Sequence, residues 1–183
     1  TKACESGLHT NAAIAGAIDA AKKSGGALHL MGINSDAGVH GLLEHLYAIL
    51  RACKTLAFSR VFLHLFTDGR DTGPFTGLRY ASQVDAACKE IGVGRIASVA
   101  GRYYAMDRDH RWERVKLAHD CLVGHHAPRA RSVPEAIQQY YDNPSGDTLK
   151  GDEFVTPTAI GSAEDVAESR IKDGDAVIFY NYR

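Results

Sequence analysis

The chain of 183 residues carries 45% apolar and 23% charged residues and a formal net charge of −1. This composition is typical of a soluble globular domain, and the near-neutral charge argues against bulk binding of nucleic acid. No apolar run approaches the roughly 20 residues that a membrane-spanning helix requires, so no membrane association is expected.

Apolar periodicity along the chain predicts helices and strands in alternation. Helical spacing predicts helices over 11–24 and 41–55, and three more that contain Leu78 to Cys88, Trp112 to Leu122 and Ile137 to Tyr140. Short apolar runs predict strands at 27–33, 60–66, 95–99 and 175–180. This order predicts an α/β fold, a three-layer α/β/α arrangement with a largely parallel sheet, in which residues 1–183 form a single domain.

The second half of the chain carries more local signals. Ser132 and Glu135 stand three apart, as in a capping box, before the last predicted helix. Trp112 is expected to be buried, with its charged neighbours on the solvated face of their helix. Residues 142–163 are expected to form a loop that holds a short extended piece around Phe154 and Val155.

The four cysteines are widely spaced and form no C-x-x-C pair. Cys53, Cys88 and Cys121 fall within predicted helices, where a buried, reduced thiol acts as a small apolar residue. A disulfide or a metal site is the alternative. Reduced thiols indicate a cytoplasmic protein.

Each predicted strand is followed directly by polar and glycine residues, in segments 35–40, 67–72, 101–109 and 181–183. If the strands are parallel, all of these segments lie at the carboxyl edge of one sheet, where open α/β sheets bind ligands. They bring together His40, Arg70, Arg102, Arg108 and Arg183. This composition suits a small molecule with several negative charges.

Arg70 at this edge can hold a phosphate or carboxylate through two parallel hydrogen bonds, and Asp71 can orient it or accept from a substrate hydroxyl. Alternatively, Asp68 and Asp71 cap the next helix and Arg70 is solvated. His40 can donate to a phosphate or act as an acid or base near neutral pH. The remaining histidines are expected to be packing or surface residues: His9, His29, His45, His64, His110, His119, His125 and His126.

Arg102 and Arg108 are close enough on a predicted loop for both guanidiniums to face one centre. In the alternative, this loop is exposed and Arg108 pairs with Asp107 or Asp109. The run from Asp107 to His110 also resembles a metal-ligand cluster, but the arginine within it would repel a divalent cation. No G-x-G-x-x-G, G-x-x-x-x-G-K-[ST], G-x-S-x-G or H-E-x-x-H is present, so dinucleotide, P-loop and common hydrolase sites are not expected.

Taken together, five segments occur in an order that resembles a known family: 28–40, 68–72, 101–114, 152–158 and 173–183. From about Asn11 onward the chain is similar to the cofactor-independent (2,3-bisphosphoglycerate-independent) phosphoglycerate mutases. In that family an alkaline-phosphatase-like domain carries two metal ions, usually manganese, and a transiently phosphorylated serine. A second domain, inserted into the first, binds the glycerate. This chain resembles the inserted domain alone.

The resemblance implies that the chain is the substrate-binding domain of a glycolytic and gluconeogenic isomerase that interconverts 3-phosphoglycerate and 2-phosphoglycerate. It implies that the substrate-binding residues are His40, Arg70, Asp71, Arg102, Arg108 and Arg183, with the arginines on the phosphate and carboxylate. Asp71 is implied as the general acid or base that faces the glycerate hydroxyls, and His40 as the contact to the transferred phosphate. No metal or cofactor is expected in this chain, whereas two Mn²⁺ ions are expected in the complete, monomeric enzyme, whose phosphatase-like domain is the partner.

The chain stops at Arg183, inside the closing motif of the family, and contains neither the nucleophilic serine nor the metal ligands of the phosphatase-like domain. We therefore expect a fragment that is inactive alone. One competing function is a freestanding module, derived from this domain, that binds phosphorylated metabolites. Another is a metal-dependent hydrolase that uses Asp68, Asp71, Asp107 and Asp109, which requires stoichiometric binding of a divalent metal.

Overall fold

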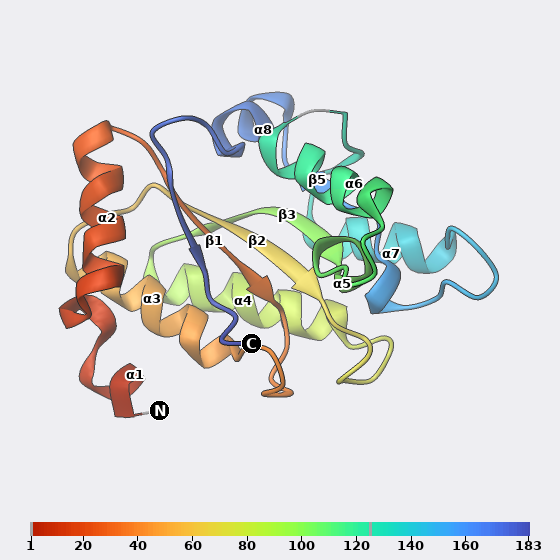
Figure 1. The fold of residues 1–183 in the computed structure, drawn as a ribbon, viewed down its shortest axis with the longest axis horizontal. Helices are drawn as coiled ribbons and strands as arrows, with labels where there is room; N and C mark the ends of the chain where they lie inside the picture. Colours follow the sequence, from red (N-terminus) through yellow and green to blue (C-terminus); the bar gives the residue numbers. More distant parts are fainter. Residues whose placement is uncertain (1, 125) are drawn as a thin grey trace.

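A sheet with the strand order β4-β5-β3-β2-β1-β6 runs through the computed structural model, which describes residues 2–124 and 126–183 (Figure 1). Four adjacent strands are parallel: β3 (Arg95–Gly101), β2 (Val61–Thr67), β1 (Leu28–Ile33) and β6 (Ala176–Phe179). Two short strands, β5 (Thr158–Ile160) and β4 (Arg129–Ala130), extend the sheet beyond β3, and β5 is antiparallel to β3. The prediction of a largely parallel sheet is confirmed.

Helices cover both faces of the sheet, as the predicted three-layer arrangement requires (Figure 1). The larger core contains apolar residues of α2 (Ala12–Ser24), α3 (Leu43–Thr55), α4 (Gly77–Ile91) and α7 (Val133–Asp142). On the other face, α6 (Trp112–Val123) and the short α5 (Arg102–Ala105) are the main cover. The other helical segments are α1 (Lys2–Ser6), α8 (Ala163–Ser169) and the 3₁₀ turns η1 (Leu8–Thr10) and η2 (Asp152–Phe154).

Strand alternation assigns side chains to these two cores. Leu28 and Leu30 of β1 lie in the larger core, whereas Met31 lies with Phe66 and Ala100 in the smaller one. The predicted burial of the three helical cysteines is also confirmed, because Cys53, Cys88 and Cys121 are all buried and none forms a disulfide. Burial raises the pKa of Cys53 and Cys121 to about 12, which is the behaviour of inert thiols.

Three local predictions need correction. Trp112 is 69% exposed, because it is the first residue of α6 and lies beyond the part of that helix that reaches the sheet. Residues 152–154 form a 3₁₀ turn rather than an extended piece, and the strand falls later, at β5. The capping box at α7 is half formed: Ser132 accepts from the Glu135 amide at 3.3 Å, but the Glu135 carboxylate accepts from the Arg131 amide at 2.7 Å.

A chain of buried polar side chains crosses the smaller face of the sheet through β1, β2 and β3. Asp175 Oδ2 lies 3.1 Å from His29 Nε2, and His29 Nδ1 lies 2.9 Å from His64 Nε2. His64 Nδ1 lies 2.7 Å from Ser98 Oγ. Because Asp175 can only accept, His29 Nε2 donates to it, and the unprotonated His29 Nδ1 accepts from His64 Nε2. His64 is neutral because burial lowers its pKa, so its Nδ1 accepts from the Ser98 hydroxyl. Burial lowers the pKa of His29 and lowers that of His64 to about 3.

The expectation that the other histidines serve packing or lie at the surface is confirmed for the described residues. His29 and His64 are buried in the polar chain, His9 and His45 are half-buried, and His110, His119 and His126 are exposed. His125 lies outside the described residues. None of the helices within residues 2–124 and 126–183 has the length and apolar character that a membrane crossing needs.

The buried polar chain predicts that stability depends on pH. Unfolded His64 takes up a proton near pH 6.5, whereas folded His64 resists protonation down to about pH 3, so acid favours the unfolded state. We expect this residue alone to lower the free energy of unfolding by about 2 kcal/mol between pH 7 and pH 5. His64→Gln should make the free energy of unfolding depend less on pH, as measured by urea titrations at several pH values. His119→Gln, at an exposed site, is the control, and equal slopes in both variants would contradict the prediction.

Candidate functional site

Because β1, β2, β3 and β6 are parallel, the chain leaves all four strands at one edge of the sheet. Arg102, the first residue of α5, follows β3 at this edge and is 8% exposed. Its Nη1 donates to Asp68 Oδ1 and to Asp71 Oδ2, both at 2.6 Å, and its Nη2 lies 2.8 Å from His40 Nε2. We call these four residues the Arg102 cluster.

The Asp68 carboxylate anchors this cluster to the sheet. Its Oδ1 accepts from the backbone amide of Asp71 at 3.0 Å as well as from Arg102, and its Oδ2 accepts from Ser35 Oγ at 2.8 Å. Burial opposes ionisation of Asp68, but these hydrogen bonds outweigh it and lower the pKa of the carboxyl. Asp68 therefore turns the loop after β2 and fixes Arg102 at the same time. Ser35, which follows β1, supports this aspartate from the neighbouring strand.

His40 accepts from Arg102, so its own ring proton is on Nδ1. Burial and the charge of Arg102 lower the pKa of His40, Asp71 opposes them, and Arg183 adds a further lowering. His40 is therefore neutral near pH 7. Its Nε2 also lies 3.4 Å from Asp71 Oδ2.

The segment that follows β6 holds the His40 loop in place. Asn181 Oδ1 accepts from the Ile33 amide at 2.9 Å, which caps the end of β1. The Tyr182 amide donates to the His40 carbonyl at 2.8 Å, and the Tyr182 hydroxyl donates to the Gly38 carbonyl. Two loops that are about 140 residues apart in sequence are thus fastened together at the edge of the sheet.

The 3₁₀ turn η2 crosses the ends of β2 and β3 and closes the other side of the edge. Thr67 Oγ1 donates to the Asp152 carbonyl at 2.6 Å, and the Gly101 amide donates to the Val155 carbonyl at 2.6 Å. Asp152 is 1% exposed, and its carboxylate accepts from the Gly77 amide at 2.7 Å, so it caps α4. A Cβ at Gly101 would lie 2.2 Å from the Glu153 carbonyl oxygen, so only glycine permits this approach.

The structure brings together some of the predicted site residues and leaves others apart. His40, Asp71 and Arg102 are in contact. Arg70 extends toward solvent, with 58% of its side chain exposed and its Nη1 3.6 Å from Glu153 Oε1. Arg108 is exposed, and Arg183 lies near enough to His40 to affect its pKa.

Asp107 shapes the loop that carries Arg108, through contacts with Arg111 and Arg114 rather than with Arg108. Asp107 Oδ2 accepts from the Arg111 amide at 2.9 Å, and its Oδ1 lies 3.5 Å from Arg114 Nη1. The Arg114 guanidinium in turn lies 3.7 Å from the centre of the Tyr103 ring. Across residues 2–124 and 126–183, no group of three or more His, Cys, Asp and Glu side chains is arranged to hold a metal ion. The Arg102 cluster itself, with a guanidinium at its centre, does not fit a cation.

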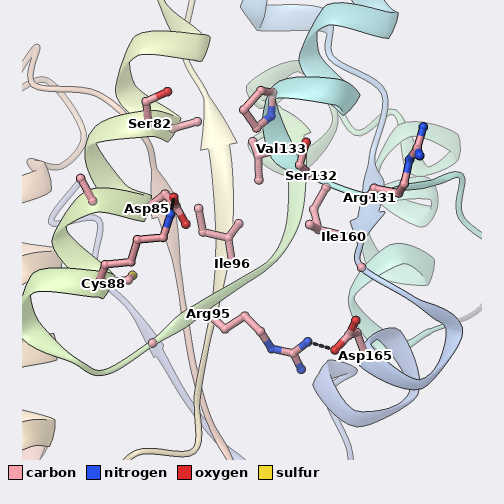
Figure 2. Close-up of a pocket in the computed structure, with 16 residues that line it drawn as sticks. Ser82, Asp85, Cys88, Arg95, Ile96, Arg131, Ser132, Val133, Ile160 and Asp165 are labelled. Atoms are coloured by element: carbon pink, nitrogen blue, oxygen red, sulfur yellow. Dashed lines mark hydrogen bonds and ion pairs between the residues drawn. The ribbon is translucent and has the colours of Figure 1, made fainter.

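A cavity of about 730 Å³ lies at the amino end of β3, where α4, α7 and β5 surround it (Figure 2). Its floor is apolar, with Ile96, Val133 and Ile160. The cations at its rim are paired: Lys89 with Asp85, Arg95 with Asp165, as the dashed line in Figure 2 marks, and Arg131 with Glu135. The cavity lies at the opposite edge of the sheet from the Arg102 cluster. The cluster is the stronger candidate site, because open α/β sheets bind ligands at the carboxyl ends of their parallel strands.

Comparisons with known proteins identify a family for this chain. The family described as "BPG-independent PGAM N-terminus" matches residues 1–183. The 2,3-bisphosphoglycerate-independent phosphoglycerate mutase of Clostridioides difficile is 46% identical over 184 residues, which cover 100% of this chain and 34% of that protein. The enzyme of the same name from Thermomicrobium roseum is 47% identical over 173 residues, covering 94% of this chain and 32% of the relative.

A solved structure agrees with these relatives. A crystal structure of Leishmania mexicana phosphoglycerate mutase at low cobalt concentration superposes with a TM-score of 0.88 at 29% identity. The match covers 100% of this chain and 34% of that one. The chain thus spans about a third of the length of the relatives it matches.

The geometry predicts that the two aspartates of the cluster contribute unequally to stability. Asp68→Ala leaves Ser35 and two loop amides without their acceptor and weakens the charge balance of buried Arg102, so we expect a loss of about 3 kcal/mol in the free energy of unfolding. The Asp71 side chain is 24% exposed, and Asp71→Ala should cost less than about 1 kcal/mol. Urea denaturation measures both, and equal losses would show that Asp68 is not the anchor.

Proposed function

The chain belongs to the family of the BPG-independent phosphoglycerate mutase N-terminus, and from this premise we propose that its Arg102 cluster binds phosphoglycerate for the complete enzyme. The proposed substrates are 3-phosphoglycerate and 2-phosphoglycerate. The observation that supports it most is the position of a buried arginine, a neutral histidine and a partly exposed aspartate at the carboxyl edge of four parallel strands. Ligands of open α/β sheets bind at this edge.

In this proposal Arg102 holds an oxyanion of the substrate through its guanidinium, while Arg70, Arg108 and Arg183 approach from the surrounding loops. Arg70 and Arg108 lie on exposed loops and can move toward a bound anion. His40, neutral with its Nε2 in the cluster, contacts the phosphoryl group during transfer. Asp71 takes a proton from one glycerate hydroxyl and returns one to the other.

The part of the relatives that this chain does not span is proposed to supply the rest of the chemistry. That part would carry the serine that is phosphorylated during transfer and two divalent metal ions, with manganese as the expected metal. The metal ions would polarise the phosphoryl group and activate the serine. The residues of this chain would bind the glycerate, orient its hydroxyls and move a proton between them. The complete enzyme is proposed to be a cytoplasmic monomer.

Because the phosphorylated serine and the metal ions are proposed to lie outside this chain, we predict that this chain alone is not a mutase. We expect no conversion of 3-phosphoglycerate to 2-phosphoglycerate by the purified chain, with or without added Mn²⁺, because the phosphate has no proposed acceptor here. A coupled enolase assay measures the product. Conversion that persists in the presence of a chelator would contradict the proposed mechanism.

Binding without turnover should be measurable. We expect the chain to bind 3-phosphoglycerate weakly and less well as salt is added, since the Asp71, Arg70 and Arg108 side of the site is exposed to water. Arg102→Lys should weaken binding several-fold, because an ammonium cannot reproduce the forked hydrogen bonds of a guanidinium. Titration followed by NMR reports both the affinity and the location. Arg131→Lys, at the remote cavity, is the control, and shifts that avoid His40 and Arg102 would remove the basis for this site.

The proposed role of Asp71 predicts a specific kinetic defect. In a complete enzyme that contains this domain, Asp71→Asn should lower kcat by about 10²–10⁴ with a much smaller change in KM, because asparagine keeps the size of the side chain without its basicity. Steady-state kinetics tests this, with Asp19→Asn on α2 as the control for the loss of one surface charge. An unchanged kcat with a raised KM would indicate that Asp71 only orients its neighbours.

A further inference from the structure

The two carboxylates that share Arg102 Nη1 differ in how firmly they are held. Both lie at 2.6 Å from that nitrogen. The Asp68 side chain is 2% exposed and has further partners in Ser35 and two loop amides. The Asp71 side chain is 24% exposed, and its contacts in the cluster are Arg102 and, at 3.4 Å, His40. Asp68 is thus a fixed counter-ion, whereas Asp71 is bound at the solvent side of the cation.

The charge of the cluster does not favour an added anion. Arg102 contributes one positive charge, Asp68 and Asp71 one negative charge each, and His40 is neutral because burial and Arg102 lower its pKa. An oxyanion that approaches from solvent meets the Asp71 carboxylate first, and that carboxylate already accepts from the guanidinium in the way a substrate oxygen would. Direct addition would place a third negative group on one guanidinium.

We propose that the Asp71 carboxylate occupies the oxyanion position of Arg102 when no substrate is bound, and that substrate binds by exchanging with it. The incoming group is a phosphate or a carboxylate, and Asp68 remains as the counter-ion during the exchange. This inference rests on the proposed function and adds a regulatory contact to the same site. No covalent bond forms or breaks in the exchange.

The exchange has two consequences for the site. Affinity for an oxyanion is lowered by the free energy needed to displace Asp71, so the chain alone binds anions weakly. Displacement also releases Asp71 from Arg102 at the moment when substrate arrives. Its carboxylate is then free to accept a proton from a hydroxyl of that substrate.

The test is the affinity of the 183-residue chain for inorganic phosphate, measured by NMR titration at pH 7 and fixed ionic strength. Asp71→Asn should bind phosphate about three- to ten-fold more tightly than the unchanged chain, because the competing charge is gone. Asp19→Asn removes an equal charge from exposed α2 and should bind within about two-fold of the unchanged chain. Asp68→Asn should bind phosphate no more tightly, because it loosens Arg102 and leaves Asp71 in place.

A parallel titration with D-glycerate separates the two oxyanion sources. Tighter binding of phosphate alone by Asp71→Asn assigns the position to the phosphate of the substrate, and tighter binding of glycerate alone assigns it to the carboxylate. Unchanged or weaker binding of both ions by Asp71→Asn overturns the exchange. If this variant does not fold, as judged by its thermal melt, Asp71→Ser replaces it with the same expectations.

A titration with 3-phosphoglycerate keeps the two proposals apart. If 3-phosphoglycerate leaves the signals of His40 and Arg102 unmoved while phosphate binds Asp71→Asn more tightly, the exchange stands and the proposed function fails. Alternatively, 3-phosphoglycerate, phosphate and glycerate each bind at the cluster with equal affinity in the unchanged chain and in Asp71→Asn. In that case the proposed function stands and the exchange fails.

Discussion

The ion pair between Asp68 and Arg102 is the interaction on which the edge of this sheet depends. A buried arginine without a counter-ion is very costly, and a buried carboxylate without donors is equally so. Here each satisfies the other at 2.6 Å, and the remaining lone pairs of Asp68 are used by Ser35 and by loop amides. The pair joins the ends of β1, β2 and β3, so the loops that carry the candidate site residues cannot shift independently.

Around this pair, the edge is closed by two segments from distant parts of the sequence. The η2 turn lies across β2 and β3 through the Thr67–Asp152 and Gly101–Val155 hydrogen bonds. The segment after β6 lies across β1 and the His40 loop through Asn181 and Tyr182. From this base the loop tips that carry Arg70 and Arg108 extend into solvent.

The sequence is enough to predict the strands from short apolar runs and the helices from their spacing of 3.6. The alternation of the two then predicts a parallel sheet and the edge at which polar residues gather. The resemblance was enough to predict the family, which the comparisons support across residues 1–183. Neither the sequence nor the resemblance shows which side chains pair with one another in the folded chain. That Arg102 is bound by Asp68 and Asp71, or that Asp152 caps α4, depends on contacts between residues tens of positions apart. The predictions for Trp112 and for residues 152–154 were wrong for the same reason. Tertiary packing decides whether Trp112 is buried and whether 152–154 is extended. The Ser162–Asp165 capping box that begins α8 was a readable local signal and was missed.

The pairing of β6 with β1 has a consequence for how this polypeptide is made. Strand β1 spans residues 28–33 and its neighbour β6 spans 176–179, so one side of the first strand stays unpaired until nearly all of this segment has left the ribosome. At about 5–20 residues per second, that delay lasts many seconds, during which Leu28, Leu30 and Met31 belong to an open strand edge. Such an edge can pair with another nascent chain. Truncation before β6 would leave that side of β1 unpaired permanently.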